Sequence, residues 1–204
     1  MNLFYAFLHI IGIPILKALF RLEVKGRENI PDKGGVILAS NHASYLDPIV
    51  VATASPRQLY FLAKEDLFKV KFLSWVVRRL NALPVLREKV QIATTRKSIE
   101  ILKKGEILLL FPEGTRTATG EISEGKRGVG LIAKSTGVPV IPVLIEGSGE
   151  ALPKDKRWIS SHKVWVTFGR PLYPETIKVK GKKKEIYQTT SDRIMEEIRK
   201  LSDS

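Results

Sequence analysis

The chain has 204 residues, 44% of them hydrophobic, and no repeat or low-complexity tract divides it, so we expect one domain with a single core. It contains no cysteine, which excludes disulfides, zinc–thiolate sites and a catalytic thiol, and fits a reducing compartment. The formal net charge of +13 favours nucleic acid, anionic lipid or acidic proteins as partners, without choosing among them.

The first twenty residues form an apolar segment, MNLFYAFLHIIGIPILKALF, whose one formal side-chain charge is Lys17. Roughly 20 apolar residues can span a bilayer, but Pro14 breaks this run and Gly12 weakens it. No small-residue cleavage site follows, so a membrane anchor fits better than a signal peptide. We expect residues 1–22 to form a membrane-anchoring helical segment, as two short helices in one leaflet or as a spanning helix, and residues 23–204 to form the folded domain. A buried terminal helix is the alternative.

Short apolar runs alternate with longer amphipathic segments along the rest of the chain. The runs with the pattern of strands cover residues 35–40, 58–63, 107–111, 138–145 and 163–169. The segments with helical spacing cover residues 64–80, 91–104, 125–136 and 183–202. Several strands are apolar on both faces, as buried parallel strands are. The alternation predicts an α/β domain with a mostly parallel sheet flanked by helices, in which ligands bind at the carboxyl ends of strands.

The stretch NHASYLDP, residues 41–48, follows the first predicted strand and contains His42 and Asp47. Residues five apart on a helix are about 140° out of phase, so a turn is needed to bring these two side chains together. Pro48 suits the first position of a helix that Asp47 would cap, while the preceding loop folds back. Asp47 would then accept the Nδ1 proton of His42, leaving Nε2 to remove a proton from a hydroxyl. The spacing alone leaves open a simple helix cap beside a surface histidine.

The stretch PEGTR, residues 112–116, follows the predicted strand ILLLF. Gly114 would let a backbone amide approach a ligand, and Arg116 can bind a phosphate through two parallel hydrogen bonds. Lys126 and Arg127 add positive charge at the start of a predicted helix. These residues suggest a site for an anionic group, although an exposed turn with solvated charges explains them as well. Because both polar loops leave the same edge of the predicted sheet, they can converge.

In this order, NHASYLD, FPEGTR and VPVIPV (138–143) resemble the sequence blocks of the glycerophospholipid acyltransferases. The segments 63–88 and 126–137 follow the same layout, so the resemblance covers about residues 24–170. Within that family the chain most resembles the 1-acylglycerol-3-phosphate acyltransferases, which make phosphatidic acid. The resemblance implies that residues 23–204 form an acyltransferase catalytic domain.

The resemblance also implies a role for individual residues. His42 is the general base and Asp47 orients it. The residues implied in holding the phosphorylated acceptor are Glu113, Gly114, Thr115 and Arg116, with Lys64, Lys126 and Arg127 as further contacts. Lys64 stands in a block, FLAKEDLF, where the glycerol-3-phosphate branch carries an arginine, and this departure favours the lysophospholipid branch. Amides near Gly114 or an adjacent loop would stabilise the oxyanion.

No metal or cofactor is implied; the co-substrate is an acyl thioester of coenzyme A or acyl carrier protein. The expected partners are lysophosphatidic acid and a membrane lipid surface at the cytoplasmic face of the cell membrane, and no nucleic acid. One alternative is an acyltransferase for glycerol 3-phosphate or another lysolipid. A different class is a non-catalytic binder of anionic lipid or RNA, which KVKGKKK (178–184) supports best, although such runs are usually solvated.

Overall fold

The computed structural model describes residues 10–11, 13–64, 81–85, 91–117, 121–153 and 159–203. Two predictions fall largely outside these residues. One is the helix expected over residues 64–80, and the other is the first half of the apolar N-terminal segment.

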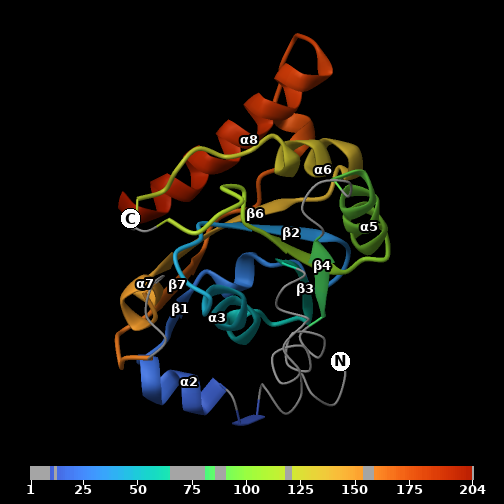
Figure 1. The fold of residues 1–204 in the computed structure, drawn as a ribbon. Coiled ribbons are helices and arrows are strands. Elements are labelled where there is room, and N and C mark those ends of the chain that lie inside the picture. The colour runs from blue at the N-terminus through green and yellow to red at the C-terminus, as the bar shows by residue number, and fades with distance from the viewer. Residues whose placement is uncertain are drawn as a thin grey trace.

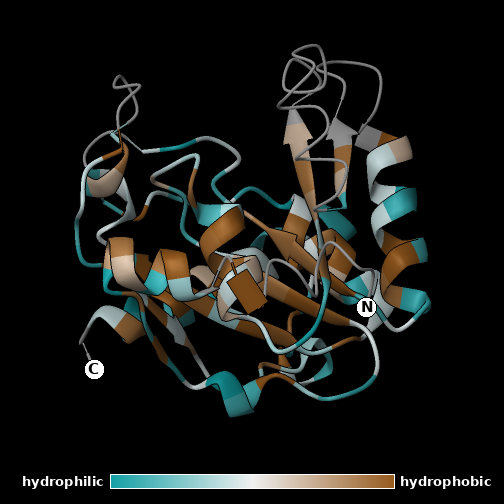
Figure 2. Ribbon diagram, turned by 90° about the horizontal axis from the view of Figure 1, so that it is seen from below, coloured by the Kyte–Doolittle hydropathy of each residue, from teal (hydrophilic) through white to brown (hydrophobic). Residues whose placement is uncertain are grey.

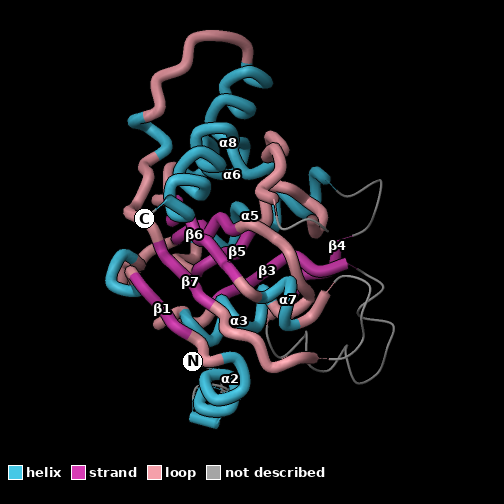
Figure 3. Tube along the Cα trace, turned by 90° about the vertical axis from the view of Figure 1, so that its left-hand side faces the viewer, coloured by secondary structure: helices cyan, strands magenta, loops and turns pink. Residues whose placement is uncertain are grey.

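A seven-stranded sheet crosses the centre of the described part of the chain, in the order β1-β7-β6-β2-β5-β3-β4 (Figure 1). In chain order the strands are β1 (Glu23–Lys25), β2 (Val36–Ser40), β3 (Leu59–Lys64), β4 (Ala82–Val85), β5 (Ile107–Leu110), β6 (Val140–Glu146) and β7 (Trp165–Phe168). Neighbouring strands are parallel except for β6 and β7, which are antiparallel. The mostly parallel sheet and its five predicted strands are confirmed. Strands β1 and β4, which were not predicted, form its two edges (Figure 3).

Helices cover both faces of the sheet, as predicted (Figures 1 and 3). One face carries α5 (Gln91–Lys103), α6 (Gly128–Thr136) and α8 (Lys183–Lys200). The other carries α2 (Ile13–Phe20), α3 (Asp47–Ala54) and α7 (Ser148–Ala151). Short 3-10 turns η2 (Arg27–Asn29), η4 (Pro174–Thr176) and η5 (Leu201–Asp203) complete the described elements. The helices expected near 91–104, 125–136 and 183–202 correspond to α5, α6 and α8.

The two faces of the sheet bury separate apolar clusters, because successive side chains of a strand point to opposite sides. On β2, Leu38 packs with the cluster that includes α3, whereas Ile37 packs with the cluster that includes α6 and α8. On β5, Leu109 and Leu108 divide in the same way. Figure 2 shows the central strands as hydrophobic bands. Every residue of β2 and β5 is therefore buried, and the loops that follow them carry the charged and titratable side chains.

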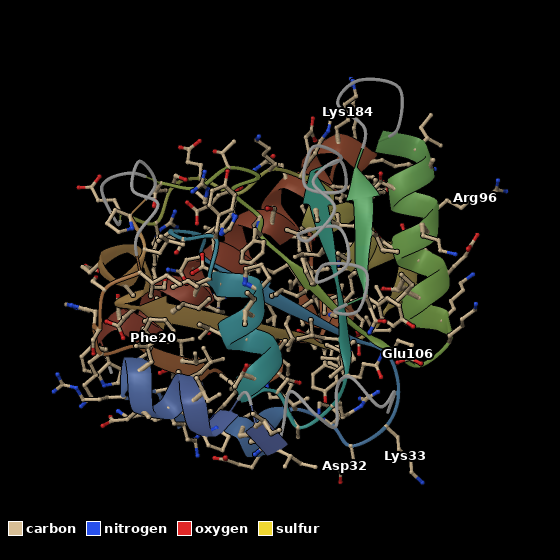
Figure 4. The ribbon with its side chains drawn as sticks, turned by 60° about the horizontal axis from the view of Figure 1, so that its bottom comes forward. Phe20, Asp32, Lys33, Arg96, Glu106 and Lys184 are labelled. Carbon is tan, nitrogen blue, oxygen red and sulfur yellow. The ribbon has the colours of Figure 1, made fainter. Side chains whose placement is uncertain are left out.

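One arginine connects the segments that precede β2 and β5, at the amino ends of these strands. Arg57 donates hydrogen bonds to the carbonyl oxygens of Pro31, Gly34 and Gly105, at 2.8, 3.0 and 2.6 Å. Figure 4 shows Asp32, Lys33 and Glu106 at this end of the sheet. The loops that follow β2 and β5 lie at the other end, where ligands of parallel sheets bind.

Helix α2 joins the N-terminal segment to the domain. Its last residue, Phe20, is buried in the core, and the Phe20 carbonyl accepts a hydrogen bond of 2.9 Å from the Val164 amide. On its outer side, Ile15 and Leu19 are 57% and 39% exposed. Among the helices that the structure describes, none combines the length and the apolar character needed to cross a bilayer. The helix therefore presents apolar side chains to solvent while its end is fixed in the core.

Candidate functional site

Asn41, the first residue after β2, fixes the direction in which the chain leaves the strand. Asn41 is buried, and its side-chain amide donates to the Ile145 carbonyl at 2.8 Å. The Ile145 amide in turn donates to Asn41 Oδ1 at 2.8 Å. This pair ties the start of the loop to the end of β6, so the next residue, His42, begins from a fixed backbone position.

The turn after Asn41 is built around one carboxylate oxygen. The His42 Nδ1 and Asp47 Oδ2 atoms are 2.7 Å apart. The same oxygen accepts hydrogen bonds of 2.8 Å from the backbone amides of Ala43 and Ser44. The Asp47 side chain is fully buried, whereas the His42 side chain is 18% exposed. The turn therefore brings imidazole and carboxylate together and leaves part of the ring open to solvent.

The expected helix cap differs from the structure by one residue. Helix α3 begins at Asp47 itself, with Leu46 at the cap position and no side-chain cap hydrogen bond. The Asp47 carboxylate points back into the turn because two amides and the imidazole there offer it three donors. The prediction of Asp47 as N-cap was therefore wrong, while Pro48 stands in the first turn of the helix as expected.

The plane of the His42 ring is set by stacking on Phe111, with ring centroids 4.0 Å apart and an interplanar angle of 19°. Phe111 directly follows β5, so a residue of the second loop supports the ring of the first. With Nδ1 held by Asp47, Nε2 is the remaining ring nitrogen, and within the described residues no hydrogen bond occupies it. This arrangement suits a general base whose tautomer is fixed by the carboxylate at Nδ1.

Glu113 joins the two loops. Its side chain is buried, with Oε1 accepting a hydrogen bond of 2.9 Å from the His42 backbone amide. Oε2 accepts one of 3.1 Å from the Ser123 amide and a second from the Ser123 hydroxyl. A backbone hydrogen bond of 2.9 Å from Thr117 to the His42 carbonyl adds a second connection. The loops after β2 and β5 thus converge, and both Glu113 carboxylate oxygens bind protein donors.

We expect Glu113→Gln to lower kcat more than it raises the KM of the acceptor. A glutamine side chain has one acceptor oxygen where the carboxylate has two. Either the His42 backbone amide or the Ser123 donors therefore lose their acceptor, at a cost of about 1–3 kcal/mol in unfolding free energy. Steady-state kinetics and thermal unfolding would measure both effects. Ser123→Ala, which removes one hydroxyl donor and leaves the carboxylate, should have a smaller effect. A change confined to the acceptor KM would instead indicate direct contact of Glu113 with the acceptor.

Gly114 and Lys126 lie against each other. Gly114 has a φ of 72°, in the left-handed region that favours glycine, and a Cβ placed there would lie 2.8 Å from Lys126 Nζ. The Gly114 amide donates to the Phe111 carbonyl at 3.0 Å, so this amide already has a partner within its turn. Thr115, Lys126 and Arg127 are exposed. The Lys126 ammonium group therefore stands at the loop after β5, available to an anion.

Arg116, in the loop after β5, contacts the turn that holds the histidine. Its Cζ atom is 3.5 Å from the centroid of the Tyr45 ring, and its Nη1 atom is buried without a hydrogen-bond partner among the described residues. Arg127 occupies the position before α6, and no contact in the described ranges joins it to residues 113–116. Lys64 ends β3, and its side chain lies outside the described residues. Of the expected cations whose side chains the structure describes, Arg116 and Lys126 are the two that it brings to the loops.

Helix α8 holds the segment that carries Ser123 and Lys126. Three of its side chains donate to backbone carbonyl oxygens there: Gln188 to Gly125 at 2.9 Å, Ser191 to Lys126 at 3.0 Å and Arg199 to Ser123 at 3.2 Å. Sequence reasoning missed these contacts and those of Tyr45 and Ser123. Most of them join segments far apart in the chain, and Ser123 reaches Glu113 from 10 residues away, so no local spacing signals them. Within the described ranges, no group of three or more His, Cys, Asp or Glu side chains could hold a metal ion.

Comparison with known proteins identifies the family. A family model described as Acyltransferase matches residues 21–146, which include both loops of the site. The chain belongs to the acyltransferase family. It is 31% identical over 153 residues to the 1-acyl-sn-glycerol-3-phosphate acyltransferase of Bacillus subtilis, covering 74% of each chain. The crystal structure of the 1-acyl-sn-glycerophosphate acyltransferase PlsC from Thermotoga maritima matches with a TM-score of 0.73 and 26% identity, covering 98% of this chain and 88% of that one.

Other acyltransferases of the family are longer. The chain is 31% identical over 159 residues to the chloroplastic 1-acyl-sn-glycerol-3-phosphate acyltransferase of Brassica napus, covering 76% of this chain but only 46% of that protein. The corresponding Arabidopsis thaliana enzyme is 29% identical, and the match covers 44% of it. The chain thus spans less than half the length of these two relatives. Helix α8, which braces the site, lies beyond the residues that the family model matches.

Proposed function

We propose that the protein transfers an acyl chain from an acyl thioester to the sn-2 hydroxyl of 1-acylglycerol 3-phosphate, giving phosphatidic acid. One observation carries this proposal: a histidine with Nδ1 held by a buried aspartate and Nε2 open, beside a loop with two cations. The names of the bacterial and plant relatives support the choice of acceptor. The expected glycerophosphate group would be bound by Arg116 and Lys126.

His42 would act on the acceptor hydroxyl. Nε2 takes the proton while the hydroxyl oxygen attacks the thioester carbonyl carbon; the new C–O bond forms, the C–S bond breaks, and the thiolate leaves with the proton returned from Nε2. Asp47 keeps Nδ1 protonated and faces the imidazolium that forms. A thioester is already activated, so no covalent intermediate on the protein is needed. General base catalysis supplies roughly 100- to 10,000-fold of the acceleration, and positioning of both substrates supplies much of the rest.

The acceptor phosphate would be held by the loop after β5. Arg116 offers the planar donors that suit a phosphate, and Lys126 adds a point charge across Gly114. The oxyanion of the tetrahedral intermediate needs other amides than that of Gly114, because the Gly114 amide donates to Phe111. An amide of an adjacent loop is therefore the better candidate for this role.

Arg116→Ala should mainly raise the acceptor KM, because it removes donors to a group that does not react. We expect an increase of roughly 10- to 150-fold, the range for hydrogen bonds between charged partners, with kcat changed less. Arg27→Ala, at an exposed arginine of η2 just after the edge strand β1, is the matched control. Initial rates over a range of lysophosphatidic acid concentrations give both constants. An unchanged KM would remove Arg116 from the phosphate site.

Residues 1–22 would anchor the catalytic domain, residues 23–204, to a membrane. Supporting this, the described end of that segment exposes apolar side chains, including Ile10 at 72%, Ile11 at 43% and Ile15 at 57%. Both the acceptor and the product are lipids, so a site held at the bilayer surface meets them directly. The net charge of +13 suits the anionic lipids of the cytoplasmic face.

The reaction is tested by acceptor-dependent thiol release from membrane-bound protein. Acyl-CoA and acyl–acyl carrier protein are each supplied with lysophosphatidic acid, with glycerol 3-phosphate and with a lysolipid of another headgroup. The proposal expects fast release with lysophosphatidic acid. Faster release with another acceptor would favour the alternative acyltransferase, and salt-dependent lipid or RNA binding without thiol release would favour a non-catalytic binder. Comparison of the two donors identifies the thioester.

A further inference from the structure

The ring of Tyr45 lies under the guanidinium of Arg116, and Tyr45 is not among the residues expected to act in the site. Tyr45 is 51% exposed, although large aromatic residues are usually more buried than this. The Arg116 Cζ atom is 3.5 Å from the ring centroid, well inside the distance at which a cation and an aromatic face attract each other. Within the described residues, this exposed ring thus contacts the cation expected to bind phosphate.

The backbone that carries the ring is held on both sides. Ser44 is buried, and its hydroxyl donates to the Leu152 carbonyl at 2.9 Å and accepts from the Leu46 amide at 3.2 Å. Leu46 is buried in the core cluster that includes α3. Tyr45 thus stands on the turn that carries His42 and Asp47, and its ring extends from a fixed base.

Stacking covers the face of a guanidinium and leaves the in-plane donors free. Arg116 Nη1 is buried and has no acceptor in the part of the chain that the structure describes, so a donor remains to be satisfied. The planar guanidinium can donate two parallel hydrogen bonds to a phosphate only when it is held in one orientation. We propose that Tyr45 is a positioning residue that holds Arg116 for the phosphate of the acceptor. This rests on the proposed function.

This arrangement links the two halves of the reaction. One short turn carries both the base, His42, and the platform for the phosphate-binding arginine. A phosphate bound by Arg116 is therefore placed relative to Nε2 by the turn itself, and the sn-2 hydroxyl of a glycerol backbone lies a few bonds from that phosphate. Tyr45 affects the acceptor through Arg116, so its loss should appear in the acceptor KM and disappear when Arg116 is absent.

The test compares Tyr45→Phe, Tyr45→Leu, Arg116→Ala and the double variant Tyr45→Leu/Arg116→Ala. Initial rates of thiol release are measured with lysophosphatidic acid and with phosphate-free monoacylglycerol. Tyr45→Leu should raise the KM for lysophosphatidic acid roughly 2- to 30-fold, the range that corresponds to measured cation–π contacts, with kcat nearly unchanged. Tyr45→Phe keeps the ring and should retain a KM near that of the wild type. The double variant should match Arg116→Ala, and monoacylglycerol kinetics should not respond to Tyr45→Leu.

Each other outcome contradicts the proposal in a recognisable way. A KM unchanged in Tyr45→Leu removes the residue from the site. A further rise in KM in the double variant, or an equal effect on monoacylglycerol, means that Tyr45 contacts the acceptor itself. A fall in kcat with loss of the unfolding transition indicates a structural role only. If the wild type releases no thiol with lysophosphatidic acid, the proposed function fails first, and the Tyr45 proposal fails with it.

Discussion

Replacing His42 with alanine is expected to lower kcat by roughly 100- to 10,000-fold, the contribution typical of a general base, while leaving the fold intact. The fold should survive because the ring is partly exposed and its contacts are few: the hydrogen bond to Asp47 and the stack on Phe111. After the substitution, Asp47 Oδ2 still accepts from the Ala43 and Ser44 amides. Thiol release measures the loss, and thermal unfolding monitors the fold.

His162→Ala is the control for His42→Ala, because His162 is exposed in the loop before β7. It should retain wild-type turnover. Turnover near the wild-type rate in His42→Ala would contradict the assignment of the base.

Replacing Asp47 with asparagine should reduce both activity and stability. One Asp47 oxygen accepts from three donors, and the other is buried without a partner among the described residues. An asparagine either turns its amino group toward those donors or buries it where no acceptor is present. Either arrangement costs about 1–3 kcal/mol of unfolding free energy.

The activity loss has a separate cause. An amino group facing Nδ1 favours the tautomer that is protonated on Nε2, which cannot take a proton from the acceptor. We expect kcat to fall by roughly 100- to 10,000-fold, the size of effect that loss of a histidine-orienting carboxylate can have. Asp32→Asn, an exposed site at the opposite end of the sheet, is the matched control. A variant that unfolds earlier but keeps its kcat would limit Asp47 to a structural role.

The sequence predicted the strands that have strong apolar patterns and missed the two that do not. Strand β1 has three residues, Glu23–Lys25, with exposed ends, and β4 contains Pro84. Both are edge strands, where pairing on one side only leaves short and polar or proline-containing runs acceptable. Their formation depends on neighbours distant in the chain, so their own residues give little signal.

In the candidate site, too, the contacts set by local sequence were predicted and those between more distant residues were not. The contact between His42 and Asp47 follows from a local turn of six residues, and the meeting of the two loops follows from the neighbouring strands β2 and β5. By contrast, the contact of Tyr45 with Arg116 depends on how the two loops pack together. The contact of Ser123 with Glu113 depends on how the segment after β5 folds back on itself. The sequence therefore predicted the contact between His42 and Asp47, whereas the residues that hold this pair in place required the structure.

Direct transfer of the acyl chain to an acceptor activated by His42 is the central step of the proposed mechanism. A rapid-quench experiment with a radiolabelled acyl thioester follows both the protein and the lipid. We expect no label on the protein without acceptor, and labelled phosphatidic acid as soon as lysophosphatidic acid is added to the wild type. Labelled protein formed before the acceptor is added, or labelled product formed as fast by His42→Ala, would contradict it.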